Sequence, residues 1–150
     1  MQGRAFARDG VFRSECGVSI AIAAPAARVW ALLTDAADFP RWNSTVTRIQ
    51  GQIALGERLK ITVPSSDRSF GVEVSELVAE QRMVWSGGAA LLFRGVRTFT
   101  LSPRSDGGVE FSMVEVMSGV MLPLIQSSLP DLTQPFEQYA ADLKREAEQA

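Results

Sequence analysis

The sequence predicts one α+β domain, in which a seven-stranded, curved antiparallel sheet wraps around a long C-terminal helix and two short helices lie between the first two strands. Apolar residues recur at helical spacing in two segments, just after Pro25 and near the C-terminus. Between them, residues 46–119 alternate apolar and polar positions, as half-buried strands do. Short polar breaks separate these runs, which indicates hairpins and therefore an antiparallel sheet. A length of 150 residues suits a single domain spanning residues 1–150.

The N-terminal segment is expected to contain a loose end and then a long strand. Residues 1–10 are largely polar and contain glycine, which favours a loose end. Residues 11–24 alternate as a strand, and one of its faces carries Cys16, Val18, Ile20 and Ile22.

Two short helices are expected next. Pro25 ends the strand and begins a helix, where its missing N–H costs nothing. The apolar stripe of this helix consists of Val29, Trp30, Leu32 and Leu33. Thr34 and Asp35 offer capping oxygens where the chain breaks and starts a second short turn. That turn ends at Phe39, because Pro40 disfavours helical backbone in the residue before it.

Six further strands are expected before the C-terminal helix. They cover residues 46–53, 57–64, 69–78, 82–87, 96–103 and 108–119. The turn at 104–108 makes a hairpin of the last two and fixes their register if Pro103 faces Val109. Arg97 then lies opposite Glu115 on the largely apolar inner face, and we predict an ion pair between them, because a lone buried charge is costly.

The C-terminal segment, residues 122–150, is predicted to be helical and divided by Pro130 and Pro135, with Asp131 or Thr133 as a cap. Its apolar face carries Phe136, Tyr139, Ala140 and Leu143. The preceding apolar residues 119–130 form a candidate lid. The same segment also suits a rigid connection or an apolar patch for self-association.

The composition excludes several classes of function. The chain has no histidine and one cysteine, Cys16, which rules out Ser-His-Asp and Cys-His nucleophile arrangements, Cys/His zinc sites and internal disulfides. We therefore expect no metal and no cofactor. A net charge of -2 with scattered arginines argues against nucleic acid or an anionic membrane surface as a partner. No apolar run approaches the ~20 residues that span a bilayer, so we expect no membrane insertion and a cytoplasmic protein.

Strand alternation also predicts the lining of a pocket between the sheet and the C-terminal helix. The lining is apolar, aromatic and rich in methionine, which suits a bulky apolar ligand. The candidate ligand-binding residues are Trp42, Val72, Val74, Met83, Trp85, Phe93, Arg97, Phe99, Phe111, Met113, Glu115, Met117, Leu132, Phe136 and Tyr139. Ordinary core packing is the alternative role for each of them.

Several motifs occur in the order typical of one superfamily. They are I-x-A-x-x-A-x-V-W-x-L-L-x-D at 22–35, F-P-x-W-N at 39–43, G-x-x-x-x-G at 51–56, V-W at 84–85, F-x-L-x-P at 99–103 and S-G-x-x-x-P-L at 118–124. Together they resemble the SRPBCC superfamily of START/Bet v 1-like helix-grip proteins, and most closely its polyketide cyclase/dehydrase and lipid-transport-like branch. The resemblance covers about residues 19–143. It implies a helix-grip fold with a cavity. Where the family often places a histidine, this chain has Arg97.

Three functions remain open from the sequence. The favoured one is binding of a hydrophobic small molecule (a lipid, a polyketide-like aromatic or an isoprenoid) by a bacterial carrier or sensor. The second is a cyclase or dehydratase, with Arg97, Glu115 and Tyr139 as candidate catalytic residues; Arg97 would bind a ligand oxyanion, and Glu115 would orient it or act as base. The third is a protein-interaction module with a vestigial cavity, and a homodimer is also possible. The alternative for the Arg97–Glu115 pair is a structural role, in which the two charges satisfy each other or lie near the solvent-exposed rim.

Overall fold

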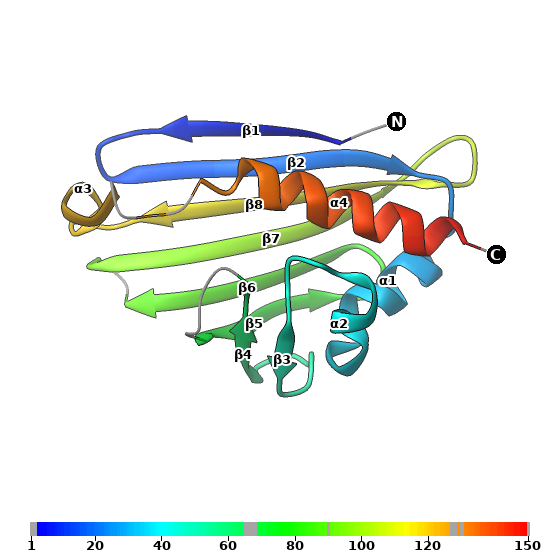
Figure 1. Ribbon diagram of the computed structural model, residues 1–150, viewed down its shortest axis with the longest axis horizontal. Coiled ribbons are helices and arrows are strands. Elements are labelled where there is room, and N and C mark those ends of the chain that lie inside the picture. The colour runs from blue at the N-terminus through cyan, green and yellow to red at the C-terminus, as the bar shows by residue number, and fades with distance from the viewer. Residues whose placement is uncertain (1–2, 65–68, 90, 127–128, 130, 150) are drawn as a thin grey trace.

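The computed structural model describes residues 3–64, 69–89, 91–126, 129 and 131–149, and shows one large curved sheet with a long helix lying across its concave face (Figure 1). The strands are β1 (Arg4–Asp9), β2 (Arg13–Ile22), β3 (Arg48–Gln50), β4 (Arg58–Thr62), β5 (Ser69–Val78), β6 (Arg82–Ala89), β7 (Phe93–Pro103) and β8 (Val109–Ser118). Their order in the sheet is β1-β2-β8-β7-β6-β5-β4-β3, and every neighbouring pair is antiparallel. The expected α+β architecture is confirmed, but with eight strands.

The extra strand is β1, so the expectation of a loose N-terminal end was wrong for Arg4–Asp9. β1 pairs along its whole length with β2, from Arg4 opposite Ser19 to Asp9 opposite Ser14. Most of its side chains are exposed, and the strand is held mainly by its backbone hydrogen bonds to β2. An edge strand whose side chains are mostly exposed gives little apolar alternation, and the sequence pattern therefore does not reveal it.

The helices between β2 and β3 are α1 (Ala26–Thr34) and α2 (Phe39–Trp42), joined by a 3-10 turn at Ala36–Asp38. Pro25 precedes α1 in extended conformation, as its fixed φ allows. Two details of the prediction were wrong. Phe39 is helical despite the following Pro40, and Asp35 makes no capping hydrogen bond with its side chain.

The C-terminal helix α4 (Thr133–Glu148) follows the one-turn helix α3 (Leu122–Ile125). Pro135 lies in the first turn of α4 and does not divide it, since a backbone N–H there has no partner within the helix. Pro130 lies outside the described residues. Asp131 accepts hydrogen bonds from the Thr133 backbone N–H, 3.0 Å, and from its hydroxyl, 2.7 Å, and so orders the start of the helix.

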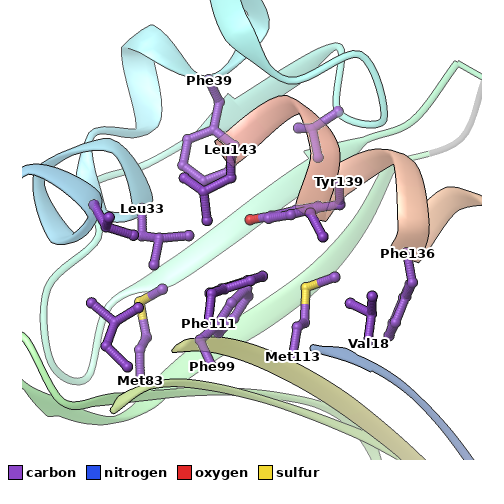
Figure 2. Packing of buried hydrophobic residues seen from close by; sticks show 14 of the residues in the cluster. Val18, Leu33, Phe39, Met83, Phe99, Phe111, Met113, Phe136, Tyr139 and Leu143 are labelled. Atoms are coloured by element: carbon purple, nitrogen blue, oxygen red, sulfur yellow. The ribbon is translucent and has the colours of Figure 1, made fainter. Parts of the chain in front are cut away.

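The core fills the space between α4, α1 and the sheet. Figure 2 shows Phe136, Tyr139 and Leu143 of α4 facing Phe99, Phe111 and Met113 of the sheet. The ring of Tyr139 stacks on Phe111, with centroids 6.2 Å apart and planes 6° apart. This core occupies the half of the concave face that lies toward α1 and α2 and leaves the other half for a cavity.

None of the described helices is long and apolar enough to cross a membrane.

Candidate functional site

A cavity of about 880 Å³ lies between the concave face of the sheet and the first turns of α4. Most of its wall is apolar or glycine. The strands and the loop before β3 contribute Ser44, Thr45, Val46, Ile61, Val63, Pro64, Phe70, Gly71, Val72, Trp85, Gly87, Gly88, Phe93, Gly95, Arg97, Glu115 and Met117. The C-terminal segment contributes Leu129, Leu132, Gln134, Pro135, Phe136, Gln138 and Tyr139. Phe70, Pro64, Gln134 and Pro135 are exposed, so the cavity opens between the start of β5 and the start of α4.

The structure divides the residues predicted for the lining into two groups. The wall contains Val72, Trp85, Phe93, Arg97, Glu115, Met117, Leu132, Phe136 and Tyr139. The closed core, and not the wall, contains Trp42, Val74, Met83, Phe99, Phe111 and Met113. Strand alternation identifies the inner face, but side chains of α4, α1 and α2 fill the space above only one part of it, and the six misplaced residues lie in that part.

Arg97 and Glu115 form the ion pair that the hairpin register predicts. The two residues are directly opposed, and Arg97 Nε donates to Glu115 Oε1 over 2.9 Å. Each side chain is 16% exposed, and the Arg97 guanidinium lies 4.9 Å from the centroid of the Phe136 ring. The pair thus places one fixed cation and one fixed anion in a mainly apolar wall, and the cation contacts both a carboxylate and an aromatic face.

Two residues of the wall, Trp85 and Tyr139, also carry a buried polar atom without a hydrogen-bond partner among the described residues, the indole N–H and the phenol hydroxyl. The hydroxyl of Tyr139 points toward Leu143 in the closed core (Figure 2). Burial raises the pKa of Tyr139 well above its ordinary value, although Arg97 opposes the shift. Tyr139 therefore remains protonated at neutral pH. It can donate a proton in a hydrogen bond, but it cannot act as a base there.

The loop at 43–46, which forms one side of the cavity, is fastened to α4 by Asp142. Asp142 accepts hydrogen bonds from the Ser44 N–H (2.8 Å) and hydroxyl (2.7 Å), from Gln138 (2.8 Å) and from Arg145 (3.1 Å). Burial alone would raise the pKa of Asp142, but these hydrogen bonds lower it below its ordinary value. The carboxylate is therefore charged at neutral pH and holds this side of the cavity in place.

Sequence reasoning missed the 44–46 loop and the glycines of the wall. Gly87 and Gly95 lie on the inner face of β6 and β7, where other positions carry large apolar side chains. A Cβ at Gly95 would meet nothing within 4 Å. Glycine weakens a strand interior and has no side chain to fill the space above the sheet. Inward-facing glycines on two neighbouring strands were therefore a signal in the sequence for a cavity.

A smaller cavity of about 350 Å³ lies beside the first and shares Glu115, Met117, Leu129 and Leu132 with it. It is more polar and contains Cys16, whose thiol has its pKa raised to about 11 by burial and by nearby Asp131 and Glu115. Within the described part of the chain, no three Cys, Asp or Glu side chains group closely enough to hold a metal ion.

Most of the described residues of the candidate lid at 119–130 lie outside the cavity wall. Gly119 has φ +132°, and Leu122 of α3 is fully buried, which anchors the segment. Of its described residues, only Leu129 lines the large cavity. Residues 127, 128 and 130 are outside the described residues, so the lid stays a prediction.

A curved antiparallel sheet that holds a C-terminal helix above a cavity defines the helix-grip proteins of the SRPBCC superfamily. A family model described as polyketide cyclase / dehydrase and lipid transport matches residues 15–148, and the chain belongs to this family. A comparison with curated proteins gives no match.

Solved structures show the same fold at low sequence identity. Truncated norcoclaurine synthase from Thalictrum flavum is 11% identical over 95% of this chain and 98% of its own, with a TM-score of 0.69. The di-domain ARO/CYC protein StfQ of the steffimycin biosynthetic pathway is 12% identical over 91% of this chain and 52% of its own, with a TM-score of 0.71. A protein from Rhodobacter sphaeroides is 21% identical over 95% of this chain and 96% of its own, with a TM-score of 0.64. At these identities the similarity establishes the fold alone.

Proposed function

We propose that this protein binds a hydrophobic small molecule, such as a lipid, a polyketide-like aromatic or an isoprenoid, as a cytoplasmic carrier or sensor. The observation that carries the proposal is the cavity of about 880 Å³, with a mainly apolar wall and an open mouth. Its volume lies within the range of about 300–1,000 Å³ that is usual for pockets of drug-sized ligands. A protein-interaction module with a vestigial cavity would have filled this space with side chains.

The polar atoms of the wall favour a ligand that carries oxygen. Arg97 uses Nε for Glu115, and no hydrogen bond from its two terminal nitrogens occurs within the described residues. These donors, with the N–H of Trp85, suit the carbonyl, hydroxyl or carboxylate oxygens of an otherwise apolar molecule. The family description, which includes polyketide cyclases and lipid transport, supports the same class of ligand.

A titration with an apolar fluorescent dye tests this proposal. Gly95→Leu places a side chain in the open space of the cavity, and should weaken dye binding about tenfold or more without lowering stability. Val96→Leu is the matched control, because the neighbouring residue of β7 faces the other side of the sheet. Equal dye binding by wild type and Gly95→Leu would place the bound dye outside the cavity and refute the proposal.

The Arg97–Glu115 pair also supports a second candidate function, a cyclase or dehydratase that uses the same cavity. A carboxylate 2.9 Å from a guanidinium in an apolar wall could accept a proton from a bound substrate while the cation stabilises an enolate. Glu115→Gln should then abolish turnover of a polyketide-like substrate and leave its binding intact, whereas Glu110→Gln, an exposed change on β8, should leave both intact. Equal turnover by Glu115→Gln and wild type would exclude this role of Glu115.

A further inference from the structure

Exposed apolar side chains concentrate at one end of the molecule. Of the eleven large apolar residues that are exposed in the described part of the chain, seven lie in the connections at this end. They are Val11 and Phe12 between β1 and β2, Leu91 and Leu92 between β6 and β7, and Val120, Met121 and Leu124 in the segment after β8. We call these seven residues the apolar tip. It lies at the end of the sheet marked by α3 in Figure 1.

The apolar tip is a fixed surface because backbone hydrogen bonds join its three connections. The Gly119 N–H donates to Phe12 O (3.1 Å), the Val120 N–H to Leu91 O (2.9 Å) and the Met121 N–H to Leu92 O (2.9 Å). Leu91 is also in left-handed conformation, with φ 74°, which is unfavourable for a leucine, and its side chain is 84% exposed. The structure thus holds a large apolar side chain in solvent at a position where glycine or asparagine would be easier to accommodate.

Two arginines lie directly behind the apolar tip on the outer face of the sheet. Arg94 alternates with Phe93 and Gly95 of the cavity wall, so it points outward. Ser118 lies opposite both Arg94 and Arg13, which places the two arginines in one row. Arg13 pairs with Glu15 at 3.0 Å, whereas Arg94 has no carboxylate partner within the described residues. The end of the molecule therefore presents apolar side chains first and an uncompensated cation just behind them.

We propose that the apolar tip docks on the surface of a lipid bilayer, with Arg94 and Arg13 at the level of the lipid headgroups. Leucine, valine and methionine at the ends of connections can enter the acyl-chain boundary, and arginines behind them can contact anionic headgroups. Protein-binding hot spots are instead enriched in Trp, Tyr and Arg, with Leu and Val under-represented. Docking of this kind requires no membrane-spanning segment. It revises the expectation drawn from the net charge, because the fold brings Arg13 and Arg94, distant in sequence, into one row behind the apolar tip.

The position of the cavity next to the apolar tip also supports docking on a lipid bilayer. Gly88 and Phe93, on either side of the Leu91–Leu92 connection, belong to the cavity wall. An apolar ligand dissolved in a bilayer would thus lie next to its binding site when the apolar tip is docked. The docking goes beyond the proposed ligand binding, and either one can fail without the other.

Co-sedimentation with lipid vesicles tests the docking. The vesicles contain phosphatidylcholine alone or phosphatidylcholine mixed with phosphatidylglycerol. The test variant is Leu91→Asn/Leu124→Asn, since asparagine tolerates left-handed backbone and both side chains are exposed. Leu55→Asn is the matched control, because Leu55 is 65% exposed but lies between β3 and β4, away from the apolar tip. Arg94→Gln is compared in the same way with Arg58→Gln on β4.

We expect wild type and Leu55→Asn to sediment with both kinds of vesicle. The affinity of Leu91→Asn/Leu124→Asn for both should be lower by about tenfold or more. Arg94→Gln should have about fivefold lower affinity for the vesicles that contain phosphatidylglycerol and unchanged affinity for those of phosphatidylcholine alone. Arg58→Gln should bind both kinds of vesicle like wild type. Thermal unfolding and dye binding verify that each variant is folded and retains its cavity. The proposal is overturned if wild type stays in the supernatant, or if the double variant sediments like wild type. It is also overturned if wild type is a dimer that the double variant dissociates, since the apolar tip would then contact a second copy.

Discussion

The ion pair between Arg97 and Glu115 makes a quantitative prediction about stability. Arg97→Met leaves the Glu115 carboxylate without its partner, and Glu115→Gln leaves the Arg97 guanidinium without its counter-charge, on a wall where each side chain is only 16% exposed. Breaking a fully buried pair costs about 3–5 kcal/mol, and an exposed pair is worth about 0.2–1 kcal/mol. For this intermediate exposure we expect a coupling energy of about 2 kcal/mol in a double-mutant cycle.

The single variants should differ from each other. Arg97→Met also loses the contact of the guanidinium with the Phe136 ring, worth about 1 kcal/mol, so it should be the less stable of the two. In a domain of 150 residues, each kcal/mol lowers Tm by about 2–4 °C. Urea unfolding at neutral pH, followed by tryptophan fluorescence, gives the four free energies of the cycle.

A surface pair provides the control for this cycle. Arg82 and Glu76 are also 2.9 Å apart, but their side chains are 46% and 44% exposed. Their coupling should not exceed about 0.5 kcal/mol. If the changes in the free energy of unfolding of the two single variants add up to that of the double variant within about 0.5 kcal/mol, the two side chains are not coupled. The expected effect of their burial is then refuted.

Three further predictions concern Asp142, Cys16 and Tyr139. Asp142→Asn should cost about 1.5–3 kcal/mol in urea unfolding, because it removes the buried, charged acceptor of four hydrogen bonds. The folded pKa of Asp142 lies below its ordinary 3.8, so this contribution is present above pH 3.8 and is lost as the pH falls below it, and acid should destabilise the variant less than wild type. Cys16, with a pKa of about 11 in place of 9.0, should react with iodoacetamide at mildly alkaline pH about 100-fold more slowly in folded than in unfolded protein, and equal rates would contradict its burial. Tyr139→Phe should stabilise the ligand-free protein by about 1 kcal/mol, since it removes a buried hydroxyl without a partner within the described residues; a loss of stability would mean that the hydroxyl is hydrogen-bonded.

Much of the sheet could be predicted from the sequence because one of its faces is buried. The turn at 104–108 and the alternation of β7 and β8 were enough to place Arg97 opposite Glu115. β1 could not be found in this way, because its pairing depends on backbone hydrogen bonds and its side chains are mostly exposed.

The cavity was less predictable than the sheet. Alternation places Met113 and Met117 on the same face of β8, yet Met113 is in the closed core and Met117 is in the cavity wall. The difference depends on how far α4 and α1 extend across the sheet, which is a matter of tertiary packing. The apolar tip was equally hidden, since its residues come from three connections that are distant in sequence.

Native mass spectrometry of the purified protein shows whether the cavity beside Arg97 binds an apolar molecule. Wild type and Gly95→Leu are each incubated with the same set of apolar, oxygen-bearing compounds and measured under native and then denaturing conditions. We expect one bound molecule per wild-type chain that is released on unfolding, and a bound fraction about tenfold lower or less on Gly95→Leu at the same compound concentration, because the added side chain narrows the cavity. Equal bound fractions on the two proteins, or no bound molecule on wild type, would contradict ligand binding in this cavity.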